Sequence, residues 1–302
     1  MDFLPHPFYD HLASHLEDSD LFKISFKLSA CTLTKVSQVH YEKRQKVTLS
    51  AVQTEGEWFF SYGKEPNRTL ADLTRYEYVK RVVFTYKRHS FRYRDSFFWK
   101  DSLEKILGIL PRYLRRADIM WYRHVAIDKS NTKLWDIFFA SGLSRAPFSS
   151  ITMPYVDHRS VEFLRRQISF RGLEKLDISA TSPPSVWDCI EELLRQLQLS
   201  YVSITDMCAV SSHMVEALIQ KRSSSKFGFS IKGKKHPDLD LEQWSNDPCA
   251  RDKEEIQRYG DRCLSFVYVH PMTKAETRFY SDDLYVSISP FTAPPKWRSD
   301  YP

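Results

Sequence analysis

The chain has 302 residues, of which 14% are aromatic and eight are glycine, and its formal net charge of +6 comes from 44 basic and 38 acidic residues. This composition is typical of a folded protein and excludes a disordered chain. A mild positive excess spread along the sequence does not by itself indicate nucleic-acid binding. No apolar run is long enough to span a membrane, and the N-terminus lacks the basic start of a secretory signal. We therefore expect an intracellular protein, cytoplasmic or nuclear.

The sequence offers few groups that suggest chemistry. Its five cysteines are widely scattered, with no CxxC pair and no histidine at zinc spacing, so we interpret them as reduced structural thiols. No metalloprotease, nucleotide-binding or serine-hydrolase motif occurs. The pairs His6/Asp10 and Asp238/Asp240 are the candidate acid-base groups, but both lie in segments whose composition is typical of the protein surface. We therefore predict no catalysis, no metal and no cofactor.

The first sixteen residues predict a short amphipathic helix, entered through two prolines. Four residues recur there at helical spacing: Phe8, His11, Leu12 and Leu16. Composition alone favours packing of this helix on the domain behind it. The Leu-Pro pair at its start also resembles the beginning of an F-box, and the resemblance implies that Leu4, Pro5 and Phe8 contact a Skp-type adaptor.

Residues 21–52 predict a polar helix that leads into a β-prone run. The segment ends in the pattern V-x-x-x-H-x-E-K-R, which comprises Val36, His40, Glu42, Lys43 and Arg44. The order of elements resembles that of the nematode families of F-box-related proteins: an initial Leu-Pro helix, this pattern, a strand pair and a repeat-like body. The resemblance implies substrate presentation to a Skp-cullin ubiquitin ligase. The stretch between residues 16 and 36 departs from the family, because it is richer in Ser, Thr and Lys than a Skp-binding helical trio.

Residues 56–94 predict strands with a turn at 64–67, because apolar and polar residues roughly alternate. From residue 80 onward, basic side chains mix with aromatic ones, and such a mixture can contact phosphates and stack bases. Nucleic-acid binding is therefore an alternative function, carried by Lys80, Arg81, Tyr86, Lys87, Arg88, Arg92 and Arg94. No RNP-like or glycine-rich signature accompanies the run, so we favour a hydrated hairpin with core-facing aromatics.

Two helices are predicted within residues 101–144, separated by an apolar run from residue 117 to 127. Pro111 should bend or end the first helix. In the apolar run, Ala117, Met120 and Tyr122 fit the first, fourth and sixth places of the motif that follows. We expect this run to form an atypical first unit of a repeat.

A short apolar motif occurs three times between residues 148 and 231, as FSSITM from Phe148, LEKLDI from Leu173 and LSYVSI from Leu199. A fainter copy begins at Phe227. Side chains in the fourth and sixth places share one face of a strand, and the residues between them face outward. The motif resembles the LxxLxL part of a leucine-rich repeat, which implies a solenoid of strand-helix units.

An amphipathic helix is predicted after each copy of the motif, with Ser160 and Ser185 as caps of the first two helices and Ser212 at the start of the third. The apolar residues of the three helices are Val161, Leu164 and Ile168; Val186, Ile190, Leu193 and Leu197; and Met214, Val215 and Leu218. Because each unit alone leaves an apolar face open, we expect the units to stack through right-handed connections. An ordinary α/β domain with three similar units is the alternative.

Stacked strands place their outward positions in register and form a continuous face. Those positions are Ser150, Thr152, Lys175, Asp177, Tyr201 and Ser203. We expect them either to bind a protein segment or to form an ordinary hydrated surface.

Beyond Ile231 the composition becomes charged and polar, so a loop or boundary is expected near residues 232–240. A terminal hairpin is predicted with Leu264, Phe266 and Tyr268 in one strand and Arg278 and Tyr280 in the other. Residues 282–290 can add a third strand that covers the open end of the stack. We expect the proline-rich residues 291–302 to be disordered.

These elements predict an α/β fold: a leucine-rich-repeat-like strand-helix solenoid with an irregular N-terminal helix and strand region and a C-terminal β-hairpin cap. The expected parts are an F-box-like helical remnant (1–50), the repeat-like body (51–231), the loop and hairpin cap (232–290) and the tail (291–302). The leading hypothesis is a non-enzymatic interaction module that acts as a substrate adaptor of a Skp-cullin-F-box ubiquitin ligase. Its partners would be a Skp-type protein and an unidentified substrate, with no membrane involved. A nucleic-acid-binding protein and a stand-alone interaction scaffold are the alternatives.

Overall fold

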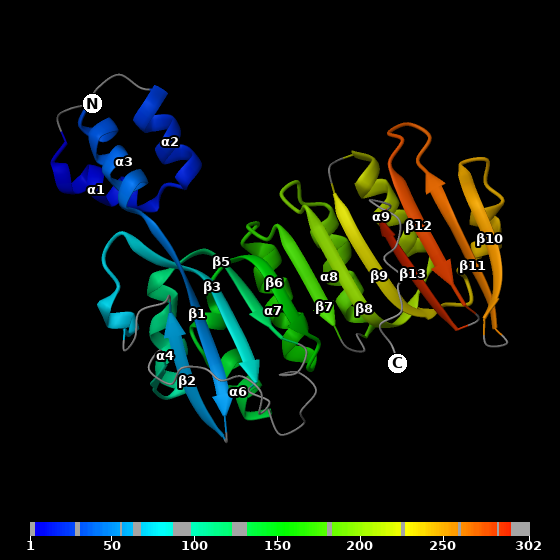
Figure 1. Ribbon diagram of the computed structural model, residues 1–302, viewed down its shortest axis with the longest axis horizontal. Coiled ribbons are helices and arrows are strands. Elements are labelled where there is room, and N and C mark those ends of the chain that lie inside the picture. Colours follow the sequence, from blue (N-terminus) through cyan, green and yellow to red (C-terminus); the bar gives the residue numbers. More distant parts are fainter. Residues whose placement is uncertain are drawn as a thin grey trace. The chain divides into compact units, whose positions relative to one another are not determined.

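The computed structural model describes residues 4–27, 31–54, 56–62, 68–86, 98–122, 132–179, 183–224, 227–258, 261–282 and 284–290. The chain divides into two compact units, Met1–Ala117 and Asp118–Pro302. Figure 1 shows the first unit in blue to green and the second in green to red. Strand β5 (Leu114–Trp121) crosses the boundary between the units. The part boundaries expected at residues 50, 231 and 290 stay predictions.

Three helices begin the first unit, namely α1 (His6–His15), α2 (Asp18–Lys27) and α3 (Thr32–Lys43). The prolines act as predicted, because Pro5 is the N-cap of α1 and a second proline lies in its first turn. A small core of Tyr9, Ala13, Leu21 and Val36 joins the helices. We did not predict a helical trio here, because the composition is polar; the three helices pack around this small apolar core.

The strands of the first unit follow in the order β5-β3-β1-β2-β4. Strand β1 (Gln45–Thr54) pairs in parallel with β3 (Glu77–Tyr86), whereas β2 (Glu57–Tyr62) pairs antiparallel with β1 and β4 (Trp99–Lys100). The predicted strands between residues 56 and 86 are thus confirmed. Helix α4 (Leu103–Ile109) ends just before Pro111 and passes into the short 3-10 helix η3 (Leu110–Tyr113), as the proline predicts.

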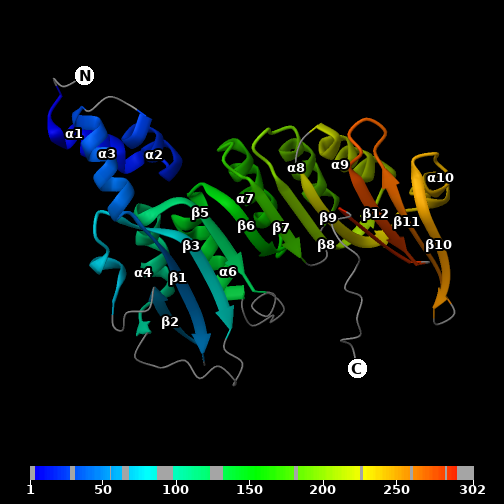
Figure 2. The same cartoon turned by 45° about the horizontal axis from the view of Figure 1, so that its top comes forward.

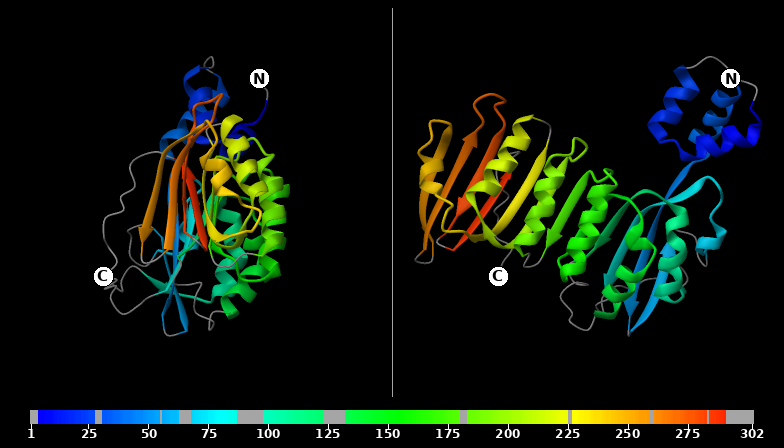
Figure 3. Two further views of the ribbon diagram at one scale, coloured as in Figure 1. Left: turned by 90° about the vertical axis from the view of Figure 1, so that its right-hand side faces the viewer. Right: turned by 180° about the vertical axis from the view of Figure 1, so that it is seen from behind.

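The second unit alternates strands and helices. Its elements up to β9 are α6 (Thr132–Ala140), η5 (Leu143–Arg145), β6 (Phe148–Pro154), α7 (His158–Ser169), β7 (Lys175–Ser179), α8 (Pro184–Leu194), β8 (Tyr201–Val210), α9 (Ser212–Ser224) and β9 (Gly228–Lys235). Strands β6 to β9 pair with one another in chain order, and every pair is parallel. Figure 2 shows these strands side by side, and Figure 3 shows α7, α8 and α9 on one face of them. The predicted α/β class is therefore confirmed.

The repeated apolar motif forms the core of this unit. All nine residues in its first, fourth and sixth places are at most 2% exposed: Phe148, Ile151, Met153, Leu173, Leu176, Ile178, Leu199, Val202 and Ile204. Equivalent residues face one another across the strands, since Ile151 pairs with Leu176 and Leu176 with Val202. Burying each such side chain stabilises the fold by about 1.5–3 kcal/mol.

The register predicted for β5 is wrong. Its buried residues are Ala117, Ile119 and Trp121, so Met120 is only partly buried and Tyr122 is 51% exposed. The apolar run allowed two registers one residue apart, and a shift by one residue reverses every side chain. Trp121 takes the core position because its ring packs on the aromatic rings of α6.

Both predicted helix caps are also wrong. Helix α7 has Asp157 as its N-cap instead of Ser160, and α8 has Pro183 instead of Ser185. Aspartate caps a helix as well as serine does, and proline is favoured at the first helical position, where Pro184 begins α8, so each helix starts before the predicted serine. Helix α9 begins at Ser212, as predicted.

The apolar face of α8 is shorter than predicted. Val186, Ile190 and Leu193 are buried, but the helix ends at Leu194, so Leu197 lies beyond it and is 94% exposed. Leu197 therefore has helical spacing in the sequence without being part of the helix.

The second unit ends in four antiparallel strands, β10 (Ala250–Arg258), β11 (Asp261–Val269), β12 (Glu276–Ser281) and β13 (Tyr285–Pro290), preceded by the short helix α10 (Leu241–Ser245). Strands β11 and β12 form the predicted hairpin, and β13 pairs with both β12 and β9, which confirms that a third strand covers the edge of β9. The loop predicted near residues 232–240 begins too early, because β9 runs to Lys235. Strand β10 was missed since its charged sequence, typical of an edge strand, hides its alternation. The expected disorder of residues 291–302 lies outside the described residues.

Candidate functional site

The predicted adaptor-binding and partner-binding residues lie on two surfaces. We call Leu4, Phe8 and Leu12 the helix surface, and the side of strands β6–β9 opposite α7–α9 the strand face. In the part of the chain that the structure describes, no helix is long and apolar enough to cross a membrane, and no cluster of three His, Cys, Asp or Glu residues is placed to hold a metal ion.

The helix surface is a set of exposed apolar residues at the start of α1 and along it. Leu4, Phe8 and Leu12 are 49%, 47% and 37% exposed. Phe8 and Leu12 are four residues apart on α1 and therefore share one side of the helix, whereas Leu4 lies two residues before its first residue. Tyr9 and Ala13, on the adjacent side, are buried in the small core. The apolar stripe expected to pack on the domain therefore faces outward in part. The predicted adaptor residues, including Pro5 at the helix start, are accessible.

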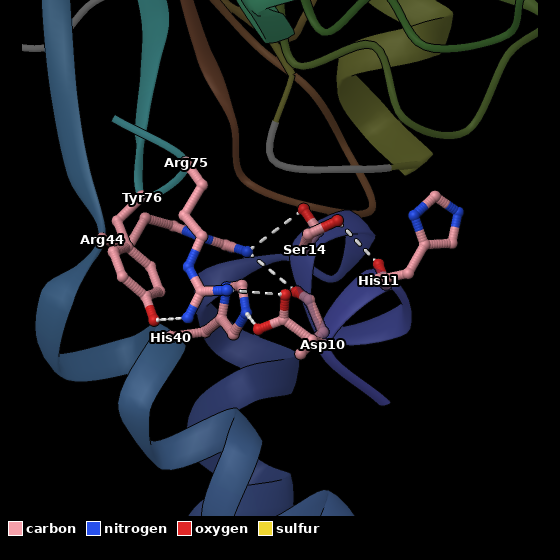
Figure 4. Close-up of polar contacts among 8 residues, drawn as sticks. Asp10, His11, Ser14, His40, Arg44, Arg75 and Tyr76 are labelled. Atoms are coloured by element: carbon pink, nitrogen blue, oxygen red, sulfur yellow. Dashed lines mark hydrogen bonds and ion pairs between the residues drawn. The ribbon is translucent and has the colours of Figure 1, made fainter. Parts of the chain in front are cut away.

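A buried histidine fixes α1 to α3. His40 Nε2 lies 3.0 Å from Asp10 Oδ1, and Arg75 Nη1 donates to the other oxygen of this carboxylate at 3.1 Å (Figure 4). The hydrogen bond from His40 lowers the pKa of Asp10 below its usual range. Burial in turn lowers the pKa of His40, so the imidazole is neutral at neutral pH and donates from Nε2. Asp10, which the sequence paired with His6, thus has a structural partner thirty residues away.

Arg44 fixes the other end of α1. Its side chain is 4% exposed, and it donates to the carbonyl oxygens of Ala13, Ser14 and Leu16 and to the carboxylate of Asp18. These carbonyls lie in the last turn of α1 and at its C-cap, where no backbone N–H four residues further on continues the helix. Three residues of the family-like pattern, Val36, His40 and Arg44, therefore hold the helices together and do not form an exposed site.

The structure adds an exposed aromatic group that the sequence analysis missed. The rings of Phe22 and Phe26 on α2 lie 4.9 Å apart, and Tyr41 on α3 lies 5.7 and 6.1 Å from them. All three side chains are at least 40% exposed. Two phenylalanines four residues apart were the available signal, since such pairs share one side of a helix.

The strand face has the predicted register. Ser150 pairs with Lys175 and Lys175 with Tyr201, so these three side chains form one row. The second row joins Thr152, Asp177 and Ser203 in the same way. Strand β9 extends the rows, because Gly228 pairs with Tyr201 and Ser230 with Ser203.

Exposure differs between the members of the strand face. Lys175 is exposed, and Tyr201 is 37% exposed. Ser150, Thr152 and Asp177 are partly buried, whereas Ser203 is only 8% exposed and contributes little surface. The accessible part of this face is therefore centred on β7, β8 and β9.

The basic stretch that suggested nucleic acid is described only at its start. Lys80 and Arg81 lie on β3, and the Lys80 ammonium donates to the carbonyl oxygen of Arg116. Lys87, Arg88, Arg92 and Arg94 lie outside the described residues. The other carboxylate pair has structural contacts, because Asp238 lies 2.6 Å from His236 Nδ1 and Asp240 caps α10.

We compared the chain with protein-family models, with curated proteins and with solved structures. None of these comparisons gave a match. We therefore infer function from the geometry of the helix surface and the strand face.

Proposed function

We propose that the protein is a non-enzymatic protein-interaction module whose helix surface binds an adaptor protein and whose strand-helix body contacts a second protein. The resemblance to nematode F-box-related families gives the adaptor its identity, a Skp-type protein of a Skp-cullin ubiquitin ligase. Such a complex would act in the cytoplasm or nucleus. In this proposal the strand-helix units stack in the manner of leucine-rich repeats.

The exposed residues Phe8 and Leu12 on an immobilised helix, together with Leu4 just before its start, carry the proposal. Apolar side chains gathered on one side of a surface helix mark an interaction site more often than scattered ones do. His40 and Arg44 hold the helix at its middle and end, so binding costs little conformational entropy. Burying a leucine and a phenylalanine would contribute about 1.5–3 kcal/mol each.

Purified wild-type protein and a Leu4→Asp/Phe8→Asp variant should be compared for binding to a Skp-type adaptor by isothermal titration calorimetry. Both side chains are exposed, so the variant should retain the wild-type circular dichroism spectrum and melting temperature. We expect binding to weaken by a factor of about 100 or more, since each 1.4 kcal/mol is tenfold in affinity. Leu197→Asp is the matched control, because Leu197 is a 94% exposed leucine of the second unit.

An intact chain that does not bind the adaptor would refute the ligase part of the proposal. The protein would then be a stand-alone interaction scaffold. Equal loss of binding in the Leu197→Asp control would show that added negative charge, and not the helix surface, determines the result.

A further inference from the structure

We propose that the strand face binds an acidic, extended segment of a partner protein, with Tyr201 as its apolar contact and Lys175, Lys232 and Lys234 as its charge partners. The inference deepens the proposed function by giving the chemistry of the second protein. It rests on the chain being an interaction protein, but not on the adaptor.

Tyr201 is positioned by a glycine on the neighbouring strand. Gly228 is its partner on β9, and a Cβ added at Gly228 would lie 3.1 Å from Tyr201 Cδ2. Glycine thus lets the ring approach the backbone of β9, while 37% of the residue stays exposed. A ring supported in this way offers apolar area at a low cost in conformational entropy.

The charge of the strand face is positive. Lys175 on β7 and Lys232 and Lys234 on β9 are exposed. No ion pair joins any of these three lysines to a described residue. Among the described side chains on this face of β6–β9, Asp177 is the one carboxylate. Opposite charge on a partner would therefore be steered to this face.

The spacing of these groups fits an extended chain. Lys232 lies four residues beyond the partner of Tyr201 along β9, a distance of roughly 13 Å at about 3.3 Å per residue. Lys175 lies one strand away from Tyr201 on the other side, or about 4.8 Å. An extended segment of about five residues can therefore contact the ring and reach Lys232.

These observations favour a polypeptide over a nucleic acid. Three lysines provide fewer cations than the roughly six to ten phosphate contacts of a typical DNA-binding protein. The Asp177 carboxylate would repel phosphates, but it can accept a backbone N–H of a peptide. The hydroxyls of Ser150, Thr152 and Ser230 can donate to backbone carbonyls in the same way.

The test is fluorescence anisotropy with a fluorescein-labelled peptide of about ten residues, which is long enough to cross the rows at roughly 3.3 Å per residue. The peptide alternates glutamate and serine around a central phenylalanine. The comparison probes are the same peptide with glutamine in place of glutamate and an oligothymidylate of similar length. We expect the wild-type protein to bind the glutamate peptide and not the glutamine peptide.

Three variants locate the binding. Lys232→Glu/Lys234→Glu should weaken binding about tenfold or more through charge reversal, and Tyr201→Ala about fivefold, whereas Tyr201→Phe should keep most of it. Lys133→Glu/Arg195→Glu is the matched control, because it reverses two exposed charges of the same unit, one on α6 and one at the C-cap of α8. It should bind like wild type.

The proposal is overturned if wild-type protein does not bind the glutamate peptide, if it binds the glutamine peptide equally well, or if the control variant loses binding as much as Lys232→Glu/Lys234→Glu does. Tighter binding of the oligothymidylate that is lost in Lys232→Glu/Lys234→Glu would make the face a nucleic-acid surface. Failure here is distinct from failure of the adaptor proposal, because Leu4→Asp/Phe8→Asp should leave peptide binding unchanged.

Discussion

Replacement of Arg44 by alanine should loosen α1 without unfolding the second unit. The guanidinium donates to Leu16 O at 2.5 Å, to Ala13 O at 2.9 Å and to Asp18 Oδ1 at 3.2 Å. Its side chain is 4% exposed, whereas that of Asp18 is 35% exposed. The variant therefore leaves the end of α1 without its cationic donor, whereas Asp18 keeps its ion pair with Lys46.

Each hydrogen bond from a charged donor contributes about 1.5–3 kcal/mol, and the partly exposed groups recover some of this from water. Summed over the end of α1, we expect a loss of about 3 kcal/mol in the free energy that holds the helix in place. Since 1.4 kcal/mol is tenfold, opening of α1 should become about 100 times more frequent.

Hydrogen-deuterium exchange read by mass spectrometry measures this opening directly. Peptides that cover His6–His15 should lose about two orders of magnitude of protection, while peptides that cover β7 and β8 should not change. Lys35→Ala is the control, because Lys35 is an exposed lysine of the same helix region. Unchanged protection of α1 in Arg44→Ala, or an equal loss of protection in Lys35→Ala, would refute the inference that Arg44 holds α1 in place.

Two further predictions test the core and the buried histidine. Leu176→Ala should lower the free energy of unfolding by about 2–5 kcal/mol, because Leu176 is 1% exposed. Leu197→Ala should leave this free energy almost unchanged, because Leu197 is 94% exposed. Urea denaturation of both variants measures the difference, and equal losses would contradict the observed core. Burial lowers the pKa of His40 in the folded chain below its usual 6.5. As the pH falls, His40 therefore binds a proton more readily in the unfolded chain than in the folded chain. Stability that is present above about pH 6.5 should be lost as the pH falls below this value. Melting temperatures measured from pH 5 to 8 should show this slope in wild type and not in His40→Gln, and an equal slope in both would refute it.

The repeated motif made the second unit predictable to the level of single side chains. Its first, fourth and sixth places are all buried because parallel strands with helices on one face impose the same inward positions on every unit. The outward rows followed from the same rule. The register of these rows was predictable, but the burial of Ser203 was not, because burial depends on neighbours that periodicity does not describe.

Other parts depended on contacts between residues that are distant in the sequence. Which of Trp121 and Tyr122 enters the core was decided by the aromatic rings of α6. The hydrogen bond between His40 and Asp10 joins residues thirty positions apart. Strand β10 reads as a polar loop because an edge strand carries charge on both sides. None of these features has a local signal.

The two sets of residues that suggested the F-box-related families have different roles, and this makes the proposed function testable in two independent ways. Val36, His40 and Arg44 are buried and fix the position of α1, whereas Phe8 on this helix and Leu4 just before it are exposed. The first set can persist wherever the helices must pack, even if the adaptor contact has been lost. Arg44→Ala should therefore weaken adaptor binding only as far as it raises exchange in α1, whereas Leu4→Asp/Phe8→Asp should abolish binding with exchange unchanged. Adaptor binding that survives the second variant would show that the adaptor contacts a surface other than Leu4 and Phe8.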